Sequence, residues 1–312
     1  MKRVLANDGI HPTGKQLLEA AGFEVITEKV PQEKLPLVIN DYDAIIVRSA
    51  TKIRKDLIDQ MQRIRLICRA GVGLDNIDVD YAQSRGIEVR NTPGASSQSV
   101  AELVMGHLLT IARFMHRSNR EMAHGDMKQL KKSYSKGKQL AGSTMGIIGL
   151  GRIGAAVARM AYGMGMEVLA ADPYVKEREL SLFGPQGTKL NLITIPMEDV
   201  LRRCDALTLH VPASDHPLIG ADELALMKDD AILINAARGG VIDENALLQA
   251  LDNGKLFGVG LDVFAGEPTP DPRLLRHPKI SVTPHIGAST VRAQELIGEE
   301  LARIIIDKLG RD

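Results

Sequence analysis

Short apolar runs rich in β-branched residues alternate with amphipathic stretches of helical spacing through nearly the whole chain. This alternation is typical of parallel βαβ units, in which a helix connects each strand to the next. We therefore predict an α/β fold with doubly wound parallel sheets. The predicted strands cover residues 3–6, 23–27, 44–48, 66–70 and 87–90 in a first series, and 145–149, 167–171, 206–210, 231–235, 257–261 and 280–283 in a second.

One segment between the two series has a longer helical pattern. Its apolar positions recur at helical spacing from near Ser97 to about Ala123, which predicts a single long helix. The polar, lysine-rich stretch 124–143 follows, and we interpret it as an exposed arm. A last helix is predicted over 289–309. The pattern as a whole indicates two α/β units of unequal size.

Composition narrows the class of protein. A chain of 312 residues predicts about two domains, at roughly 150 residues per domain. Lys+Arg and Asp+Glu both number 39, and this balance argues against nucleic acid as the main partner. Cys68 and Cys204 lie far apart in apolar sequence, which favours buried thiols in the cytoplasm over a disulfide. With neither a signal-peptide pattern nor an uninterrupted apolar run of membrane-spanning length, we expect no membrane partner.

A glycine motif follows the first strand of the second series. Gly149, Gly151 and Gly154 form G-x-G-x-x-G directly after an apolar strand and before a helical stretch. In a dinucleotide site these glycines allow a tight turn, close approach of the pyrophosphate, and close packing of helix on strand. The free N–H groups of the helix N-terminus, which include those near Arg152 and Ile153, attract phosphate. The context predicts a dinucleotide site, although the motif alone is weak evidence.

Asp172 ends the next predicted strand, eighteen residues after Gly154. An acid at this position accepts hydrogen bonds from the adenosine ribose hydroxyls and repels a 2′-phosphate, so we expect NAD and not NADP as the cofactor. The alternative is that Asp172 only initiates a turn before Pro173.

Three later strands are followed by residues suited to oxidation of a hydroxy acid. Hydride transfer from a C–H bond requires removal of the hydroxyl proton, and His285 is the candidate acid/base. Glu267 would favour the protonated ring, Arg238 would bind a substrate carboxylate in two-pronged fashion, and Asp262 lies in the same segment as Glu267. Each has an ordinary alternative: a surface arginine, a solvated turn acid, and a capping or core histidine.

The sequence resembles the D-isomer-specific 2-hydroxyacid dehydrogenases, and in particular their short D-3-phosphoglycerate dehydrogenase branch without a regulatory domain. The resemblance spans almost the whole chain. The matching segments are VRSATKI (47–53), ICRAGVGLDNID (67–78), NTPGASSQSVAEL (91–103), GIIGLGRIG (146–154), INAARGGVIDENALLQAL (234–251), LDVFAGEP (261–268) and PHIGAST (284–290).

The resemblance carries several expectations. It implies two Rossmann-like domains: a discontinuous substrate-binding domain, 1–96 plus 285–312, and an NAD-binding domain, 97–284. It also implies a homodimer formed through the long helix and the arm, and the catalytic triad Arg238, Glu267 and His285. The implied cofactor contacts are Gly149, Gly151, Arg152, Ile153, Gly154, Asp172, His210, Val211, Pro212, Ala236, Ala237, Arg238, Asp262, His285 and Gly287.

Similarity to the D-3-phosphoglycerate branch suggests NAD-dependent oxidation of that acid, in serine biosynthesis. The implied substrate-binding residues are Arg48, Arg69 and Gly71 together with Arg238, because a phosphate needs cationic donors that a smaller acid does not. The two arginines of the first series have structural ion pairs as their alternative role. A glyoxylate or hydroxypyruvate reductase on the same scaffold remains open, and so does a non-catalytic, NAD-sensing protein of the corepressor type.

Overall fold

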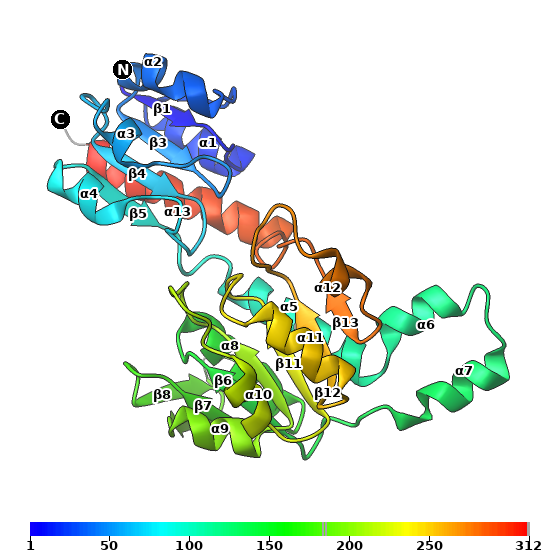
Figure 1. Ribbon diagram of the computed structural model, residues 1–312. Helices are drawn as coiled ribbons and strands as arrows, with labels where there is room; N and C mark the ends of the chain where they lie inside the picture. Colours follow the sequence, from blue (N-terminus) through cyan, green and yellow to red (C-terminus); the bar gives the residue numbers. More distant parts are fainter. Residues whose placement is uncertain (183, 185, 311–312) are drawn as a thin grey trace. The chain divides into compact units, whose positions relative to one another are not determined.

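The computed structural model describes residues 1–182, 184 and 186–310, and two parallel sheets organise them (Figure 1). The first sheet has the strand order β2-β1-β3-β4-β5. Its apolar residues alternate between two buried clusters, with Leu5 and Ile45 in one and Val4 and Ile46 in the other. Both faces are therefore covered, as parallel sheets require. The strands are β1 (Arg3–Ala6), β2 (Glu24–Ile26), β3 (Ala44–Val47), β4 (Leu66–Arg69) and β5 (Glu88–Asn91).

The helices of this unit come from both ends of the chain. The final helix, α13 (Val291–Leu309), packs against α1 (Pro12–Ala20), where a Cβ on Gly14 would collide with the backbone of Gly298. Ile297 and Leu301 of α13 join the cluster beneath β1 and β3. Short helices complete the unit: η1 (Gln32–Lys34), α2 (Leu35–Val38), η2 (Ile39–Asp41), α3 (Lys55–Ile58) and α4 (Val79–Ser84).

The second sheet has six parallel strands in the order β13-β12-β11-β10-β6-β7. The chain leaves β6 for β7 on one side and later returns to β10 on the other, so strand order reverses between β6 and β10. Ligands of open α/β sheets bind outside the carboxyl ends of the strands at such a point. The strands are β6 (Thr144–Ile148), β7 (Glu167–Ala171), β10 (Ala206–Leu209), β11 (Ala231–Asn235), β12 (Leu256–Leu261) and β13 (Ile280–Val282).

Helices cover both faces of this sheet as well. Ile232 and Ile234 enter one buried cluster, whereas Ala231 and Leu233 enter the other, as alternation along a strand demands. The predictions of an α/β fold and of the eleven principal strands are confirmed. The helices are α5 (Ser97–Ala112), α8 (Arg152–Gly163), α9 (Met197–Arg203), α10 (Ala221–Leu226), α11 (Glu244–Asp252) and α12 (Pro272–Arg276).

By its contacts the chain divides into two units, Met1–Ser97 with Ala288–Asp312, and Gln98–Gly287. The boundaries implied by the family resemblance lie after residues 96 and 284. The observed division keeps His285 in the second unit, together with Glu267 and Arg238.

The single long helix expected to reach Ala123 is wrong. The chain breaks after α5 because Phe114 adopts a left-handed conformation, with φ of 56°. Its ring lies 5.5 Å from that of Tyr134 and 5.1 Å from that of Phe257, between centroids. Helix α6 (Met115–Glu121) lies in the second part of the range predicted as one long helix. The predicted arm, 124–143, contains α7 (Met127–Ser133) and η3 (Tyr134–Lys136).

An antiparallel hairpin, β8 (Glu177–Ser181) and β9 (Lys189–Ile193), was not expected from the pattern. Leu180 and Leu192 point into the core, while charged residues alternate with them on the other face. Thr194, just after β9, forms a bridge to Ala170 of β7, so the hairpin extends the edge of the second sheet. No helix in the described ranges is long and apolar enough to span a membrane.

Candidate active site

The predicted cofactor and catalytic residues gather after the carboxyl ends of the strands of the second sheet. Parallel strands bring these ends to one edge, which is where ligands bind in this architecture. The residues following β6, β7, β10, β11, β12 and β13 are, in that order, Gly149–Gly154, Asp172, His210–Pro212, Ala236–Arg238, Asp262 with Glu267, and His285 with Gly287.

The glycine loop fits a dinucleotide pyrophosphate. A Cβ on Gly149 would collide with the carbonyl of His210, and one on Gly154 would collide with the carbonyl of Gly149, so both positions require glycine. Gly151, in contrast, faces open space. It is the N-cap of α8, whose first turn begins with Arg152 and Ile153, and it provides no side-chain cap. These first N–H groups are thus available to an anion.

Asp172 stabilises the turn considered from sequence and also contacts the glycine loop. Its Oδ1 accepts hydrogen bonds from the N–H groups of Tyr174 (2.8 Å) and Val175 (2.9 Å), which stabilise the turn after β7. Its Oδ2 accepts one from the N–H of Leu150 in the glycine loop, at 2.7 Å. Because a carboxylate oxygen has two lone pairs, Oδ2 retains acceptor capacity for a ribose hydroxyl.

The segment after β10 closes the other side of the glycine loop. Val211 lies beside Gly149, and Pro212 follows it. His210 is half-buried, with Nε2 3.1 Å from the Thr208 hydroxyl, and desolvation of the ring lowers the pKa of this histidine to about 3. A neutral ring follows, so His210 shapes the site without adding charge.

His285 and Glu267 form the central pair. The Nδ1 of His285 lies 2.8 Å from Oε2 of Glu267, and the other carboxylate oxygen accepts the N–H of Phe264 at 2.9 Å. A carboxylate can only accept, so Nδ1 carries the proton and Nε2 of the neutral ring is an acceptor. No described residue bonds to Nε2, and the His285 side chain is 45% exposed. The ring is therefore oriented and accessible.

Asp262 holds the loop that carries His285. It is 1% exposed, and its oxygens accept hydrogen bonds from the Thr283 hydroxyl (2.6 Å) and from the N–H groups of Ile286 and Gly287 (both 2.8 Å). The backbone of His285 itself is left-handed, with φ of 54°, which a non-glycine residue adopts only when its surroundings impose it. These bonds on either side of His285 supply that constraint.

Arg238 lies in a turn built by Asn235, the last residue of β11. The buried Asn235 amide accepts the N–H of Ala237 at 3.0 Å and donates to the carbonyl of Arg238 at 2.8 Å. The half-buried Arg238 guanidinium donates to the carbonyl of Ala237 at 2.6 Å. The small side chains of Ala236 and Ala237 keep the turn compact.

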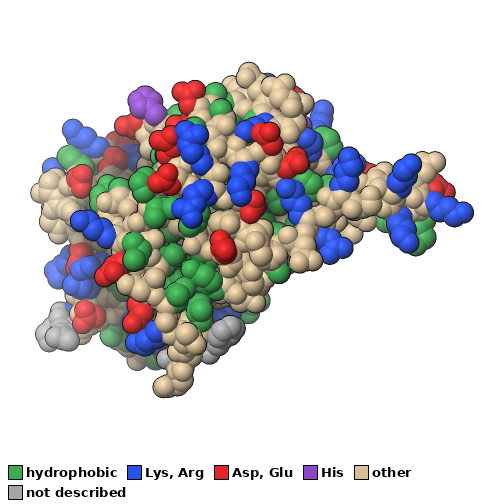
Figure 2. Space-filling view, turned by 90° about the horizontal axis from the view of Figure 1, so that it is seen from below, with side chains coloured by type: hydrophobic (Ala, Val, Ile, Leu, Met, Phe, Trp, Pro, Cys, Tyr) green, Lys and Arg blue, Asp and Glu red, His purple; other side chains and the backbone are tan. Residues whose placement is uncertain are grey.

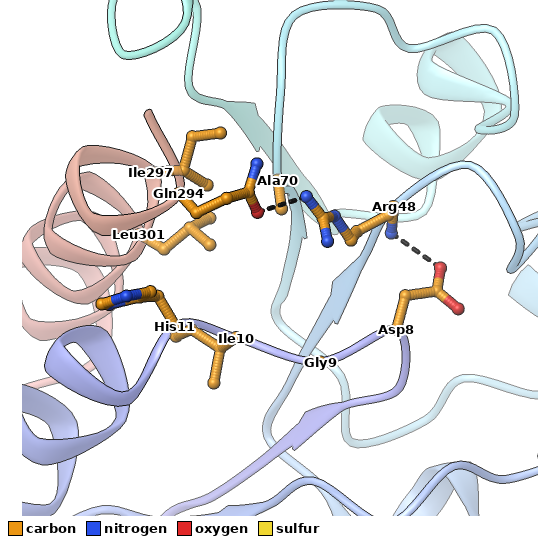
Figure 3. Close-up of a pocket in the computed structure, with 9 residues that line it drawn as sticks. All are labelled: Asp8, Gly9, Ile10, His11, Arg48, Ala70, Gln294, Ile297 and Leu301. Carbon is orange, nitrogen blue, oxygen red and sulfur yellow. Dashed lines mark hydrogen bonds between the residues drawn. The ribbon is translucent and has the colours of Figure 1, made fainter. Parts of the chain in front are cut away.

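In the first unit, Arg48 follows β3 and lines a cavity of about 270 Å³ (Figure 3). Its guanidinium donates to the side-chain amide of Gln294, a neutral partner. Within the described part of the chain, no carboxylate lies at ion-pair distance from Arg48, so the structural ion pair considered from sequence is not formed. Asp8, on the cavity wall, accepts the backbone N–H of Arg48 at 2.7 Å and the Thr51 hydroxyl at 2.8 Å.

Arg69 is the last residue of β4, and its guanidinium turns back to donate to the carbonyl of Ala70 at 3.0 Å. Gly71 has φ of 135°, and a Cβ there would overlap the Arg69 guanidinium. Glycine at position 71 is therefore what lets Arg69 fold across the backbone.

Comparison with known proteins shows the family to which this chain belongs. The family description "D-isomer specific 2-hydroxyacid dehydrogenase, NAD binding domain" matches residues 105–287. The chain belongs to the D-isomer-specific 2-hydroxyacid dehydrogenases. It is 40% identical to a hydroxypyruvate reductase of Thermotoga maritima, over 99% of this chain and 98% of that protein.

Other members of the family are also similar. A D-3-phosphoglycerate dehydrogenase of Methanocaldococcus jannaschii is 38% identical over 100% of this chain, which spans only 59% of that longer protein. A D-lactate dehydrogenase of Aquifex aeolicus, solved with NAD and lactic acid, superposes with a TM-score of 0.77 and 28% identity, covering 99% of this chain and 95% of that one. The cofactor of this dehydrogenase is NAD, as predicted.

Sequence reasoning missed two residues that support the site of this dehydrogenase. His107 of α5 is buried, with Nδ1 3.0 Å from the Ser281 hydroxyl and Nε2 3.0 Å from that of Thr283, which in turn bonds Asp262. Burial lowers the pKa of His107, with the Asp262 charge opposing this. The available signal was a polar residue on the apolar face of the predicted helix.

Glu244 is the second residue. It begins α11 and accepts the N–H of Ala265 at 2.7 Å, which holds the loop that carries Glu267. Gly239 lies against the same loop, since a Cβ there would collide with the carbonyl of Phe264. Burial raises the pKa of Glu244. Nothing local in the sequence distinguishes Glu244 from an ordinary acid at a helix start.

Proposed function

We propose that this dehydrogenase oxidises D-3-phosphoglycerate to 3-phosphohydroxypyruvate, a reaction of serine biosynthesis. The observation that carries the proposal is Arg48, a guanidinium at a cavity whose hydrogen-bond partner is a neutral amide. A phosphate requires a cation whose charge is not already neutralised by a protein carboxylate. Arg48, Arg69, or both would bind the phosphate, with Gly71 beside them.

The second unit supplies the chemistry. NAD held by the Gly149–Gly154 loop and Asp172 would supply the acceptor for the hydride from C2 of the acid. Nε2 of His285 takes the hydroxyl proton as the C2–O bond becomes double, and Glu267 stabilises the resulting imidazolium. Arg238 would bind the substrate carboxylate through charge-assisted hydrogen bonds. These roles rest on the orientation of the His285 ring and on the placement of the three residues at one sheet edge.

The experiment is a turnover assay of the purified chain with NAD and a panel of acids, including D-3-phosphoglycerate, D-glycerate and D-lactate. We expect the highest kcat/KM for D-3-phosphoglycerate. Failure to oxidise it at all would overturn the proposal while leaving the family membership untouched.

A second candidate is reduction of hydroxypyruvate or glyoxylate. It is favoured by the similarity to the Thermotoga maritima hydroxypyruvate reductase, which this chain matches over nearly its full length. An assay in the reverse direction separates the two, because a reductase would show a higher kcat/KM with NADH and hydroxypyruvate than with NADH and 3-phosphohydroxypyruvate.

We also propose a homodimer formed through α5, α6 and the arm, residues 124–143. Leu109 of α5 is 41% exposed, Met122 just after α6 is 52% exposed, and Met127 of the arm is 72% exposed. Leu109 also lines a cavity of about 530 Å³ together with Leu140 and Met164. Figure 2 shows lysine and arginine side chains along the projecting arm, so its apolar residues lie among cations.

Two buried free cysteines agree with a cytoplasmic protein.

A further inference from the structure

The unexpected β8–β9 hairpin places an arginine at the cofactor loop. Arg178 of β8 is half-buried, and its Nη1 donates to the carbonyl of Leu150 at 2.8 Å. Leu150 lies between Gly149 and Gly151 of the dinucleotide motif. A side chain from outside the βαβ motif thus contacts the loop that binds the cofactor.

Asp172 also contacts Leu150, through the backbone N–H of this residue. The Leu150 N–H donates to Asp172 at 2.7 Å, and the Leu150 carbonyl accepts from Arg178. Backbone dimensions then limit the separation of the carboxylate oxygen and the guanidinium nitrogen to less than roughly 10 Å. The two side chains do not form an ion pair with each other, so neither charge is neutralised by the other.

The other N–H donors of the Arg178 guanidinium are not paired with a carboxylate in the described part of the chain. A guanidinium has five N–H donors, and the structure shows one of them in use. No carboxylate of residues 1–182, 184 and 186–310 lies within ion-pair distance of Arg178. Its strand neighbour Glu179 pairs instead with Lys189, at 2.9 Å, on the hairpin.

We propose that Arg178 is a specificity-determining residue for the adenosine 2′ position. Asp172 rejects a 2′-phosphate, whereas Arg178 offers a cation that attracts one. Selection of NAD therefore depends on Asp172 prevailing over Arg178, and removal of the Asp172 charge exposes a 2′-phosphate site. This inference depends on the cofactor and not on which acid is the substrate.

Binding of cofactor fragments tests the proposal without turnover. Adenosine 2′,5′-bisphosphate and AMP are titrated by calorimetry into the wild type and into Asp172→Ser, Arg178→Gln and the double variant. We expect Asp172→Ser to tighten the bisphosphate relative to AMP by at least about tenfold, and the double variant to lose most of that gain. Arg178→Gln alone should weaken the bisphosphate several-fold and leave AMP nearly unchanged.

Two further variants separate charge from structure. Asp172→Ser with Arg178→Lys should keep part of the gain, because the positive charge remains. Arg202→Gln removes an exposed arginine paired with Glu198 on α9, and should change neither affinity. Equal weakening of both fragments in Arg178→Gln, or an undiminished gain in the double variant, would show that Arg178 only supports the Leu150 loop and would overturn the proposal.

Discussion

At the scale of single residues, the His285–Glu267 pair is the part of the site with the most defined chemistry. The carboxylate fixes which ring nitrogen carries the proton, and the other nitrogen is accessible. His285→Asn should lower kcat by roughly 10² to 10⁴, the range for loss of a general acid/base. NADH affinity, measured by fluorescence titration, should stay nearly unchanged. Near-normal turnover of the variant would exclude the acid/base role.

Glu267→Gln is measured in the same assays, and it should lower kcat less than His285→Asn does. The amide does not favour the imidazolium, so the acidic limb of the pH–kcat/KM profile for oxidation should move to lower pH. An unmoved profile would indicate that Glu267 only holds the loop at Phe264.

Kinetics of variants can distinguish whether Arg48 and Arg69 bind the substrate phosphate or only support the fold. Arg48→Ala and Arg69→Ala should raise KM for D-3-phosphoglycerate much more than KM for D-glycerate. The phosphorylated acid alone loses a charge-assisted hydrogen bond, worth roughly 1.5 to 3 kcal/mol. Steady-state kinetics with both acids give the comparison. Equal losses for the two acids would mark both arginines as structural.

The lowered pKa of His210 predicts a pH-dependent stability. Its pKa is about 3 in the folded chain, against about 6.5 when unfolded, so below pH 6.5 the unfolded state binds the extra proton. Stability from this residue is complete above about pH 7 and is lost as the pH falls, by about 2 kcal/mol at pH 5. His210→Asn should flatten the dependence of the free energy of unfolding between pH 7 and 5. The exposed His124→Asn is the control and should not.

At the scale of elements, the active-site loops are held by buried polar side chains on strands and helices. The chain of contacts runs from His107 of α5 through Thr283 to Asp262, which binds the N–H groups after His285. Such networks stabilise one loop conformation only when each member is satisfied. The position of His285 is thereby tied to a helix remote in sequence.

Thr283→Val tests this network, because valine has nearly the same shape and lacks the hydroxyl. We expect a loss of about 1 to 3 kcal/mol in the free energy of unfolding, since Asp262 and His107 each lose a buried partner. The kcat should also fall, while NADH affinity falls less. Thr188→Val, at an exposed position, is the matched control. Unchanged kcat in Thr283→Val would confine the network to a role in stability.

At the scale of the whole molecule, the proposed homodimer rests on the exposed apolar residues of α5, α6 and the arm. Leu109→Glu should shift the purified chain from dimer to monomer in sedimentation velocity, because it introduces a charge into an interface that buries apolar surface. Leu275→Glu on α12 is a matched control, since Leu275 is 39% exposed and lies outside the proposed interface. A monomeric wild type at micromolar concentration, or an equal response of both variants, would contradict the dimer.

Much of this protein followed from the sequence because the relevant signals are local. Strand and helix periods, and the residues that end each strand, depend on neighbours a few positions away. Gly149, Asp172, Arg238 and His285 were accessible in this way, since parallel strands place their carboxyl ends at one edge. The expectation of NAD rested on the glycine motif and Asp172, and the comparisons bear it out.

Other features depended on contacts between segments distant in the sequence. The break at Phe114 follows from aromatic partners at Tyr134 and Phe257, and the contact of Arg178 with Leu150 follows from a hairpin that forms against β7. The bonds from His107 to Ser281 and Thr283 join residues more than 170 positions apart. Periodicity could not predict these contacts, because the free energy of each side chain depends on which remote groups surround it once the sheets have assembled.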